Sequence, residues 1–279
     1  MSGAFGGASV REALDSAVIA IAAAGSDTPR LDAELLLAEA LGVDRAALVI
    51  DPRREVAGPA VRAFQDAVRR RSAGREPVAY ILGRRGFRHI ELAVDPRVLV
   101  PRPETELLVE AGLELPAGAR VVDVGTGSGA VALALKHERP DLEVLGTDVS
   151  VDALAVARAN AERLGLDVEL LHGDLLAGAD GVDAVLSNPP YVAERARAAL
   201  APEIVRHEPP GALFAGADGL DVIRRLVPAA ATSGARRLAI EVGAGQAAAV
   251  AELMRAAGYE RVGRRRDLAG IDRVVVGSR

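Results

Sequence analysis

The chain has 279 residues, half of them hydrophobic, which is long enough for more than one compact unit. Its formal net charge of −5 argues against a protein that binds nucleic acid non-specifically, so we expect no stable nucleic-acid partner. The absence of cysteine excludes disulfides and zinc–thiolate sites, and the four histidines lack the spacing of metal ligands, so we expect no metal.

The N-terminal segment, MSGAFGGASVREALDS, has no basic region followed by an apolar core, and we therefore expect no signal peptide. No later stretch reaches the ~20 uninterrupted apolar residues that a membrane span requires. The sequence therefore predicts a cytoplasmic protein without a membrane partner.

Residues 1–83 are predicted to form a small helical domain. Apolar residues recur at helical spacing, and Thr28, Pro29 and Gly42 carry the signals of a helix start and a helix end. The helices are predicted at residues 10–25, 28–42, 44–50 and 58–74. No catalytic constellation is present here, so we interpret the domain as one that binds a partner. Residues 1–90 hold 13 arginines and 11 acidic residues, whereas acidic residues are in excess in the remainder of the chain.

Residues 84–100, RRGFRHIELAVDPRVLV, change to an alternating pattern with β-branched residues and contain an Asp-Pro turn signal. We expect a β-hairpin that links the helical domain to the rest of the chain. Two prolines then precede a predicted helix within residues 101–115.

From residue 119 onward, predicted strands and helices alternate. The strands are predicted at residues 119–125, 142–148, 167–174, 181–188 and 236–243, and the helices at residues 128–138, 151–165, 219–230 and 245–258. This alternation predicts an α/β domain over residues 101–279, with a mostly parallel sheet and helices on both faces. The last two strands, 259–267 and 272–278, have only a short polar connection, so we expect them to form an antiparallel C-terminal edge pair.

A glycine-rich loop joins the first strand of this domain to its helix in the segment VVDVGTGSGAVALAL (121–135). Gly125, Gly127 and Gly129 permit tight turning and let a ligand approach the backbone, and the N-terminus of the following helix favours an anionic group. The spacing also satisfies the dinucleotide fingerprint. The loop by itself therefore predicts a nucleotide cofactor without identifying it.

Acidic residues follow the next two strands, at the edge where open α/β sheets bind their ligands. Asp148 ends the second strand, where it is a candidate to bind a ribose diol; the alternative is an ordinary helix N-cap. Asp174 and Leu175 follow the third strand, and we expect them to flank an adenine.

The fourth strand ends in the segment LSNPPYV (186–192). Prolines fix the backbone and force the preceding residue into an extended conformation, so Asn188 is predicted to be held rigidly. A plain turn is the alternative. The asparagine amide, the proline carbonyls and the ring of Tyr191 offer acceptors for an N–H₂ group and a surface on which it can stack. A dehydrogenase is disfavoured, because no His–Asp or Tyr–Lys pair is evident near this edge.

These motifs resemble those of a known enzyme family. VDVGTGSG and TDVS resemble the S-adenosylmethionine loop and ribose acid of Rossmann-like methyltransferases, and NPPY resembles the motif of methyltransferases that modify adenine N6 or glutamine N5. Four longer segments resemble the bacterial release-factor glutamine methyltransferases: REPVAYILGRRGF (75–87), VLVPRPETELLVE (98–110), EPPGALFAGADGL (208–220) and DLAGIDRVVV (267–276). The similarity runs over nearly the whole chain, including the helical domain.

The resemblance implies methylation of side-chain N5 of the glutamine in the Gly-Gly-Gln motif of class 1 peptide chain release factors, which modulates translation termination. S-adenosylmethionine is the implied cofactor and S-adenosylhomocysteine its product. The residues implied to bind the cofactor are Gly125, Thr126, Gly127, Ser128, Gly129, Asp148, Asp174, Leu175 and Asn188. Those implied to bind the substrate amide are Asn188, Pro189, Pro190 and Tyr191, of which Asn188, Pro189 and Tyr191 are the candidate catalytic residues. Relatives often carry an aromatic residue at the position of Leu175, so we expect aliphatic packing against the adenine here.

An amide nitrogen is a poor nucleophile, because its lone pair is delocalised into the carbonyl. We expect the Asn188 side-chain oxygen and the Pro189 backbone oxygen to accept both N–H bonds and to aim the nitrogen at the methyl donor. Two alternatives stand beside this interpretation: a methyltransferase acting on another protein glutamine or on adenine N6, and a cofactor-binding module without catalysis. The acidic catalytic half lacks the basic groove that an enzyme of duplex DNA needs, and an intact NPPY segment argues against a module without catalysis.

Overall fold

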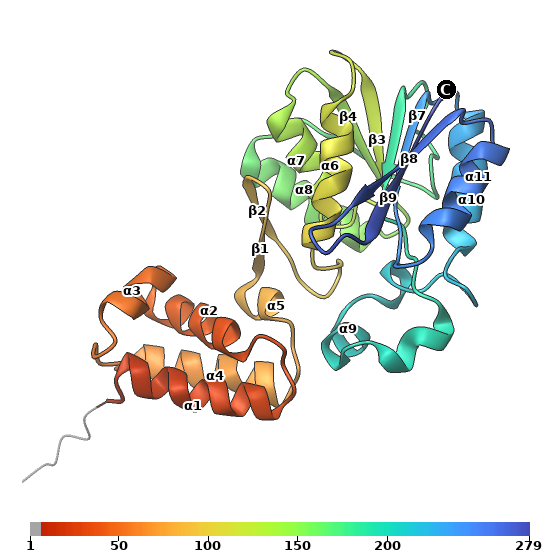
Figure 1. Ribbon diagram of the computed structural model, residues 1–279. Helices are drawn as coiled ribbons and strands as arrows, with labels where there is room; N and C mark the ends of the chain where they lie inside the picture. The colour runs from red at the N-terminus through yellow and green to blue at the C-terminus, as the bar shows by residue number, and fades with distance from the viewer. Residues whose placement is uncertain (1–6) are drawn as a thin grey trace, which may run out of the picture. The chain divides into compact units, whose positions relative to one another are not determined.

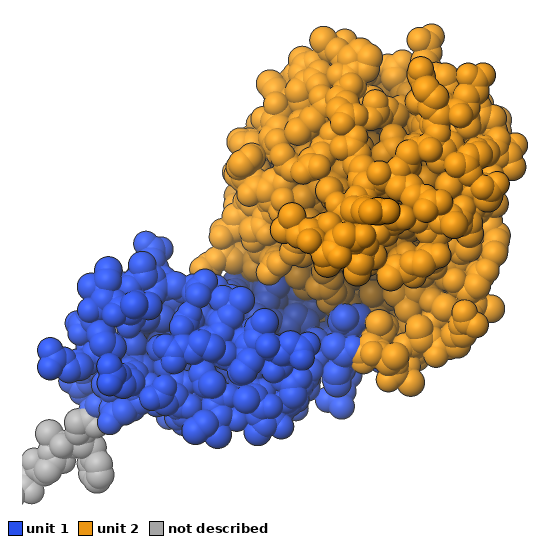
Figure 2. Space-filling model, viewed as in Figure 1, with its two compact units in different colours: residues 1–83, 201–207 blue, residues 84–200, 208–279 orange. Residues whose placement is uncertain are grey.

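The computed structural model describes residues 7–279 and divides them into two compact units (Figure 1). Residues 1–6, which belong to the predicted helical domain and to the segment predicted to lack a signal peptide, lie outside the described residues. One unit comprises the chain up to Gly83 together with Ala201–His207, and the other comprises Arg84–Leu200 and Glu208–Arg279 (Figure 2). In the described part of the chain, no helix is long and apolar enough to span a membrane.

The first unit is entirely helical. Its helices are α1 (Val10–Ala23), α2 (Pro29–Leu41), α3 (Arg45–Ile50), α4 (Pro59–Ser72), α5 (Val78–Leu82) and α9 (Pro202–His207). Helix α1 begins with a capping box, in which Ser9 and Glu12 satisfy each other's backbone N–H groups. Helix α2 begins at Pro29 and ends before Gly42, whose left-handed conformation (φ 62°) favours glycine. Apolar side chains from α1, α2 and α4 form the core, among them Leu14, Ile21, Leu36, Leu37 and Phe64.

Ion pairs with two buried arginines connect α9 to the other helices of this unit. The Arg71 Nε atom donates to Asp32 Oδ2 at 2.6 Å, and both side chains are buried. Arg71 Nη1 also donates to Glu203 Oε1 at 3.2 Å, and Arg75 pairs with the same carboxylate. The prediction placed all of residues 101–279 in one domain, whereas the structure groups 201–207 with the helices, where Glu203 pairs with Arg71 and Arg75.

The second unit is an α/β fold built on a seven-stranded sheet. Its strands are β3 (Arg120–Val124), β4 (Glu143–Asp148), β5 (Glu169–His172), β6 (Ala184–Ser187), β7 (Arg237–Glu241), β8 (Arg261–Arg266) and β9 (Asp272–Ser278). The strand order is β5-β4-β3-β6-β7-β9-β8, with the first five strands parallel and β9 antiparallel to both β7 and β8. This topology confirms the predicted Rossmann-like fold and the antiparallel edge pair.

Helices cover both faces of the sheet. Helices α6 (Glu106–Leu113), α7 (Ala130–Glu138) and α8 (Val151–Leu164) lie on one face, and α10 (Asp221–Thr232) and α11 (Ala247–Ala256) lie on the other (Figure 1). Ile223, Leu226, Val250 and Met254 from the second pair are fully buried against the sheet. Three short 3₁₀ segments, η1 (Pro103–Thr105), η2 (Glu194–Ala199) and η3 (Pro210–Ala212), complete the described elements.

The expected hairpin is present, but its turn is not the predicted one. Strands β1 (Arg84–Phe87) and β2 (Ile90–Ala93) pair directly, with Phe87 opposite Ile90, so the Asp-Pro signal lies beyond the hairpin. The Asp95 carboxylate instead accepts the backbone N–H of Arg97 and shapes the next loop. The side chain of Asn160 on α8 donates to the Ala93 carbonyl and accepts the Ala93 N–H, which attaches the hairpin to the α/β unit.

Candidate active site

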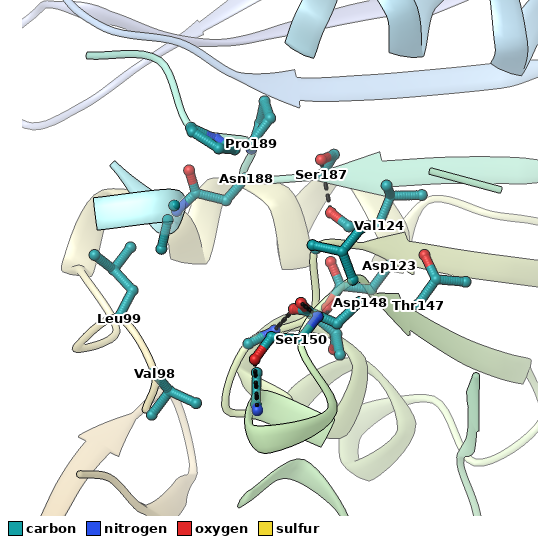
Figure 3. Close-up of a pocket in the computed structure, with 18 of the residues that line it drawn as sticks. Val98, Leu99, Asp123, Val124, Thr147, Asp148, Ser150, Ser187, Asn188 and Pro189 are labelled. Carbon is teal, nitrogen blue, oxygen red and sulfur yellow. Dashed lines mark hydrogen bonds between the residues drawn. The ribbon is translucent and has the colours of Figure 1, made fainter. Parts of the chain in front are cut away.

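A cavity of about 490 Å³ opens at the carboxyl ends of the parallel strands. The register of the sheet explains its position, since Val124 on β3 lies opposite Thr147 on β4 and opposite Ser187 on β6. The next residues along these three strands are Gly125, Asp148 and Asn188. Three segments that are distant in the sequence therefore leave the sheet at the same level, and the cavity lies where they diverge (Figure 3).

All three glycines of the loop after β3 have a left-handed backbone that favours glycine. Gly125, Gly127 and Gly129 have φ values of 73°, 57° and 83°. A Cβ atom at Gly125 or Gly127 would meet no atom within 4 Å, whereas one at Gly129 would lie 2.7 Å from Leu133 Cδ1. The first two glycines therefore leave the backbone open to the cavity, and Gly129 permits α7 to start. Thr126 and Ser128 line the cavity beside Gly125 and Gly127; Gly129 does not.

Asp148 is connected to this loop by its carboxylate. The Gly127 N–H donates to Asp148 Oδ2 at 2.9 Å, and the Ser150 N–H donates to Asp148 Oδ1 at 2.9 Å. Ser150 is the N-cap of α8, because its hydroxyl accepts the Ala153 N–H. Asp148 is thus not an ordinary helix cap, and each of its oxygens retains acceptor capacity toward the cavity that it lines.

Sequence reasoning missed the buried carboxyl group of Asp123. It accepts the Thr126 hydroxyl at 2.7 Å and the Ala132 N–H at 3.3 Å, so it joins the loop to the first turn of α7. Burial raises the pKa of Asp123 to about 7, against these two hydrogen bonds, which lower it. An acidic residue inside the otherwise apolar strand VVDVG was the available signal, since a buried carboxyl group requires a specific partner.

The predicted adenine-flanking residues also line the cavity. Leu175 has a left-handed backbone (φ 54°), which is unusual for leucine, and its carbonyl accepts the Thr147 hydroxyl at 2.6 Å. Its side chain packs against the core cluster of the α/β unit. The Asp174 carboxylate forms an ion pair with Arg225 on α10, and both side chains are more than half exposed. Asp174 therefore faces solvent at the rim of the site.

The NPPY segment places its side chains in different surroundings. Asn188, Pro189 and Pro190 line the cavity, and Asn188 Nδ2 donates to Thr105 Oγ1 at 3.1 Å. Tyr191 does not line the cavity; its hydroxyl donates to Glu241 Oε1 at 3.1 Å at the end of β7. Burial, followed by the charge of Glu241, raises the pKa of the Tyr191 hydroxyl, so this hydroxyl stays protonated and remains a donor.

A further wall of the cavity comes from the segment before α6. Val98, Leu99, Pro101 and Thr105 line it, and Figure 3 shows Val98 and Leu99 on a separate segment from Asp148 and Asn188. The sequence had singled out VLVPRPET only as part of a family resemblance. Nothing in its local pattern indicates a cavity wall, because its contact with the strand ends depends on the packing of α6.

Comparison with known proteins places this architecture in a family. Residues 12–83 match the family described as the PrmC N-terminal domain, and residues 103–230 match the methyltransferase small domain. The release factor glutamine methyltransferase of Caulobacter vibrioides is 44% identical over 263 residues, which cover 91% of this chain and 91% of that protein. The protein of the same name from Moorella thermoacetica is 44% identical over 276 residues, which cover 95% of this chain and 96% of that protein.

A solved structure supports the fold independently. The hMettl16 catalytic domain superposes with a TM-score of 0.56 at 19% identity, covering 79% of this chain and 81% of that one. At this level of identity the likeness concerns the fold alone. The extensive identity to the two curated relatives, over both units, decides the family: the chain belongs to the release factor glutamine methyltransferases.

Proposed function

We propose that this protein transfers a methyl group from S-adenosylmethionine to side-chain N5 of the glutamine in the Gly-Gly-Gln motif of class 1 peptide chain release factors. One observation carries the proposal: the glycine loop with Asp148 and the NPPY segment with Asn188 open into the same cavity. A nucleotide-type cofactor and an amide substrate can therefore meet there. The family names of the relatives support the same activity.

The residues around the loop fit the cofactor. Asp148 offers two anionic acceptor oxygens, which suit the two hydroxyls of a ribose, and the open backbone at Gly125 and Gly127 suits the polar methionine end. The aliphatic side chain of Leu175 is available to the adenine. When bound, S-adenosylmethionine supplies a methyl group made electrophilic by the positively charged sulfur.

The NPPY segment is proposed to prepare the amide nitrogen. Asn188 and Pro189 accept the two N–H bonds of the substrate glutamine and hold its nitrogen in line with the methyl donor. This is catalysis by alignment, with electrostatic support as positive charge develops on the nitrogen. Tyr191 lies outside the cavity lining, and we propose that it supports the NPPY segment from behind, with its hydroxyl held by Glu241.

The helical unit is proposed to dock the body of the release factor. It carries no catalytic constellation, and residues 1–90 have an excess of basic over acidic residues while the remainder of the chain is acidic. Contacts remote from the chemistry can hold a small target loop in place, because their binding energy offsets the cost of ordering it.

Incubation with methyl-labelled S-adenosylmethionine and a purified release factor tests the proposal. Mass mapping is expected to locate the label on the glutamine of Gly-Gly-Gln, and a factor in which that glutamine is replaced by alanine is expected to remain unlabelled. Label on another glutamine, or on nucleic acid supplied in the same reaction, would show that the substrate assignment is wrong.

A further inference from the structure

We propose that Thr105 is a positioning residue that fixes which way the Asn188 amide points, so that its oxygen and not its nitrogen is offered to the substrate. The inference rests on the proposed function and assigns a role to the PRPET segment, which that function does not use. It starts from a hydrogen bond at the wall of the cavity, between Asn188 and the buried side chain of Thr105.

In this contact the Asn188 Nδ2 atom donates to Thr105 Oγ1 at 3.1 Å. Thr105 is 3% exposed, so no water competes for this bond on the Thr105 side. The oxygen and nitrogen of a side-chain amide are bound to the same planar carbon and point in different directions. An asparagine whose nitrogen is bound by Thr105 therefore directs its oxygen elsewhere, and an acceptor is what an N–H₂ substrate needs.

The reverse orientation of Asn188 would not serve the substrate. It would turn the amide nitrogen, which only donates, toward the N–H₂ group of the substrate, which donates as well. Two donors facing each other form no hydrogen bond. A partner that holds the Asn188 nitrogen away from the substrate is therefore required.

Tyr191, at the other end of the NPPY segment, is held separately. Its hydroxyl donates to Glu241 Oε1 at 3.1 Å, and Glu241 is 1% exposed. The two ends of the segment are therefore bound by different elements, Asn188 by η1 and Tyr191 by β7. Thr105 is thus the residue to change in order to disturb Asn188 without disturbing Tyr191.

Replacement of the Thr105 hydroxyl tests the inference. Thr105→Val keeps the shape but removes the acceptor for Asn188, and we expect kcat to fall by about tenfold or more, with cofactor affinity unchanged. Thr105→Ser restores the hydroxyl and is expected to recover most of the turnover. Thr232→Val is the matched control, because the Thr232 hydroxyl bonds only the exposed end of α10. Wild-type turnover in Thr105→Val, or no rescue by serine, would overturn the inference.

Hydrogen exchange of the Asn188 side chain tests this inference without measuring methyl transfer, and so separates it from the proposed function. In protein labelled with ¹⁵N at asparagine, the Asn188 side-chain N–H₂ signal, assigned by its loss in Asn188→Ala, is expected to exchange slowly with water in the wild type. It is expected to exchange rapidly in Thr105→Val and slowly again in Thr105→Ser. If the wild type methylates no release factor, the proposed function fails while this measurement still decides the inference; equal exchange in wild type and Thr105→Val would overturn it.

Discussion

The Gly127 N–H donates a 2.9 Å hydrogen bond to Asp148 Oδ2. This bond connects the glycine loop after β3 to the carboxylate at the end of β4. The loop and Asp148, which the sequence indicated as two separate motifs, therefore form one hydrogen-bonded site. The carboxylate both shapes the loop and faces the cavity, so its removal is expected to affect cofactor binding in two ways.

Asp148→Ala is expected to weaken binding of S-adenosylmethionine by roughly 1.5–3 kcal/mol, because the ribose loses a charged acceptor and the loop loses its tie. Isothermal titration calorimetry measures this change directly. Asp152→Ala, at an exposed position in the first turn of α8, is the control and is expected to bind S-adenosylmethionine normally. Equal affinities for Asp148→Ala and wild type would remove Asp148 from the cofactor site.

Asn188→Ala is expected to retain its fold and its cofactor affinity while losing most of its turnover. The reason is that the amide lines the cavity and contacts the rest of the protein through Thr105, so its main loss falls on the substrate. An interaction made chiefly in the transition state lowers kcat and kcat/KM together. Steady-state kinetics against an intact release factor check this, and a variant with near wild-type kcat would contradict the orienting role.

The proposed docking role of the helical unit predicts a difference between substrates. Full-length enzyme is expected to methylate an intact release factor with a kcat/KM at least roughly 100-fold above that for a short Gly-Gly-Gln peptide, because the peptide lacks the remote contacts. Deletion of residues 1–83 is a poor test, since it would leave Glu203 without Arg71 and Arg75. Similar kcat/KM values for peptide and factor would show that the unit does not dock the substrate.

The buried ion pair of the helical unit predicts a large effect on stability. Arg71→Ala leaves the carboxylate of Asp32 buried without its partner, and the free energy of unfolding is expected to fall by about 3–5 kcal/mol. Arg69→Ala on the same helix is the control. The Arg69 side chain is 75% exposed, so its ion pair with Asp66 is expected to contribute less than about 1 kcal/mol. Denaturant titration compares the two variants, and equal losses would contradict the role given to burial.

The raised pKa of Asp123 predicts how stability depends on pH. Its pKa of about 7 in the folded protein exceeds the ordinary value of 3.8, so folding favours the protonated form. The resulting stabilisation is fully present below about pH 4 and is lost as the pH rises through about 7, with a total on the order of 4 kcal/mol. The groups that face Asp123 are the Thr126 hydroxyl, the Ala132 N–H and the Asp148 carboxylate, and the charge of Asp148 adds to the rise in the pKa of Asp123.

Asp123→Asn removes this titration while preserving the shape of the side chain. Its free energy of unfolding, measured by denaturation between pH 4 and pH 8, is expected to decline less with rising pH than that of the wild type. Parallel curves for the two proteins would mean that Asp123 is ionised throughout this range.

The sequence by itself determined the order of the strands and helices and the position of the chemistry along the chain. Helical and alternating periodicities are local properties, as are the left-handed glycines of GTGSG and the rigid backbone before Pro189, so each could be recognised from a few neighbouring residues. Because parallel strands end at one edge of a sheet, Gly125, Asp148 and Asn188 could also be expected to converge.

Only the tertiary structure decided which side chains meet across long distances in the sequence. Thr105 and Asn188 are 83 residues apart, Tyr191 and Glu241 are 50 apart, and Arg71 and Glu203 are 132 apart. No local pattern specifies such pairs, because each depends on how helices and strands pack against one another. The same reason explains the hairpin turn, which the attachment of β2 to Asn160 places before the Asp-Pro signal rather than at it. Local preference determines the elements, and burial of their polar side chains against distant partners determines the site.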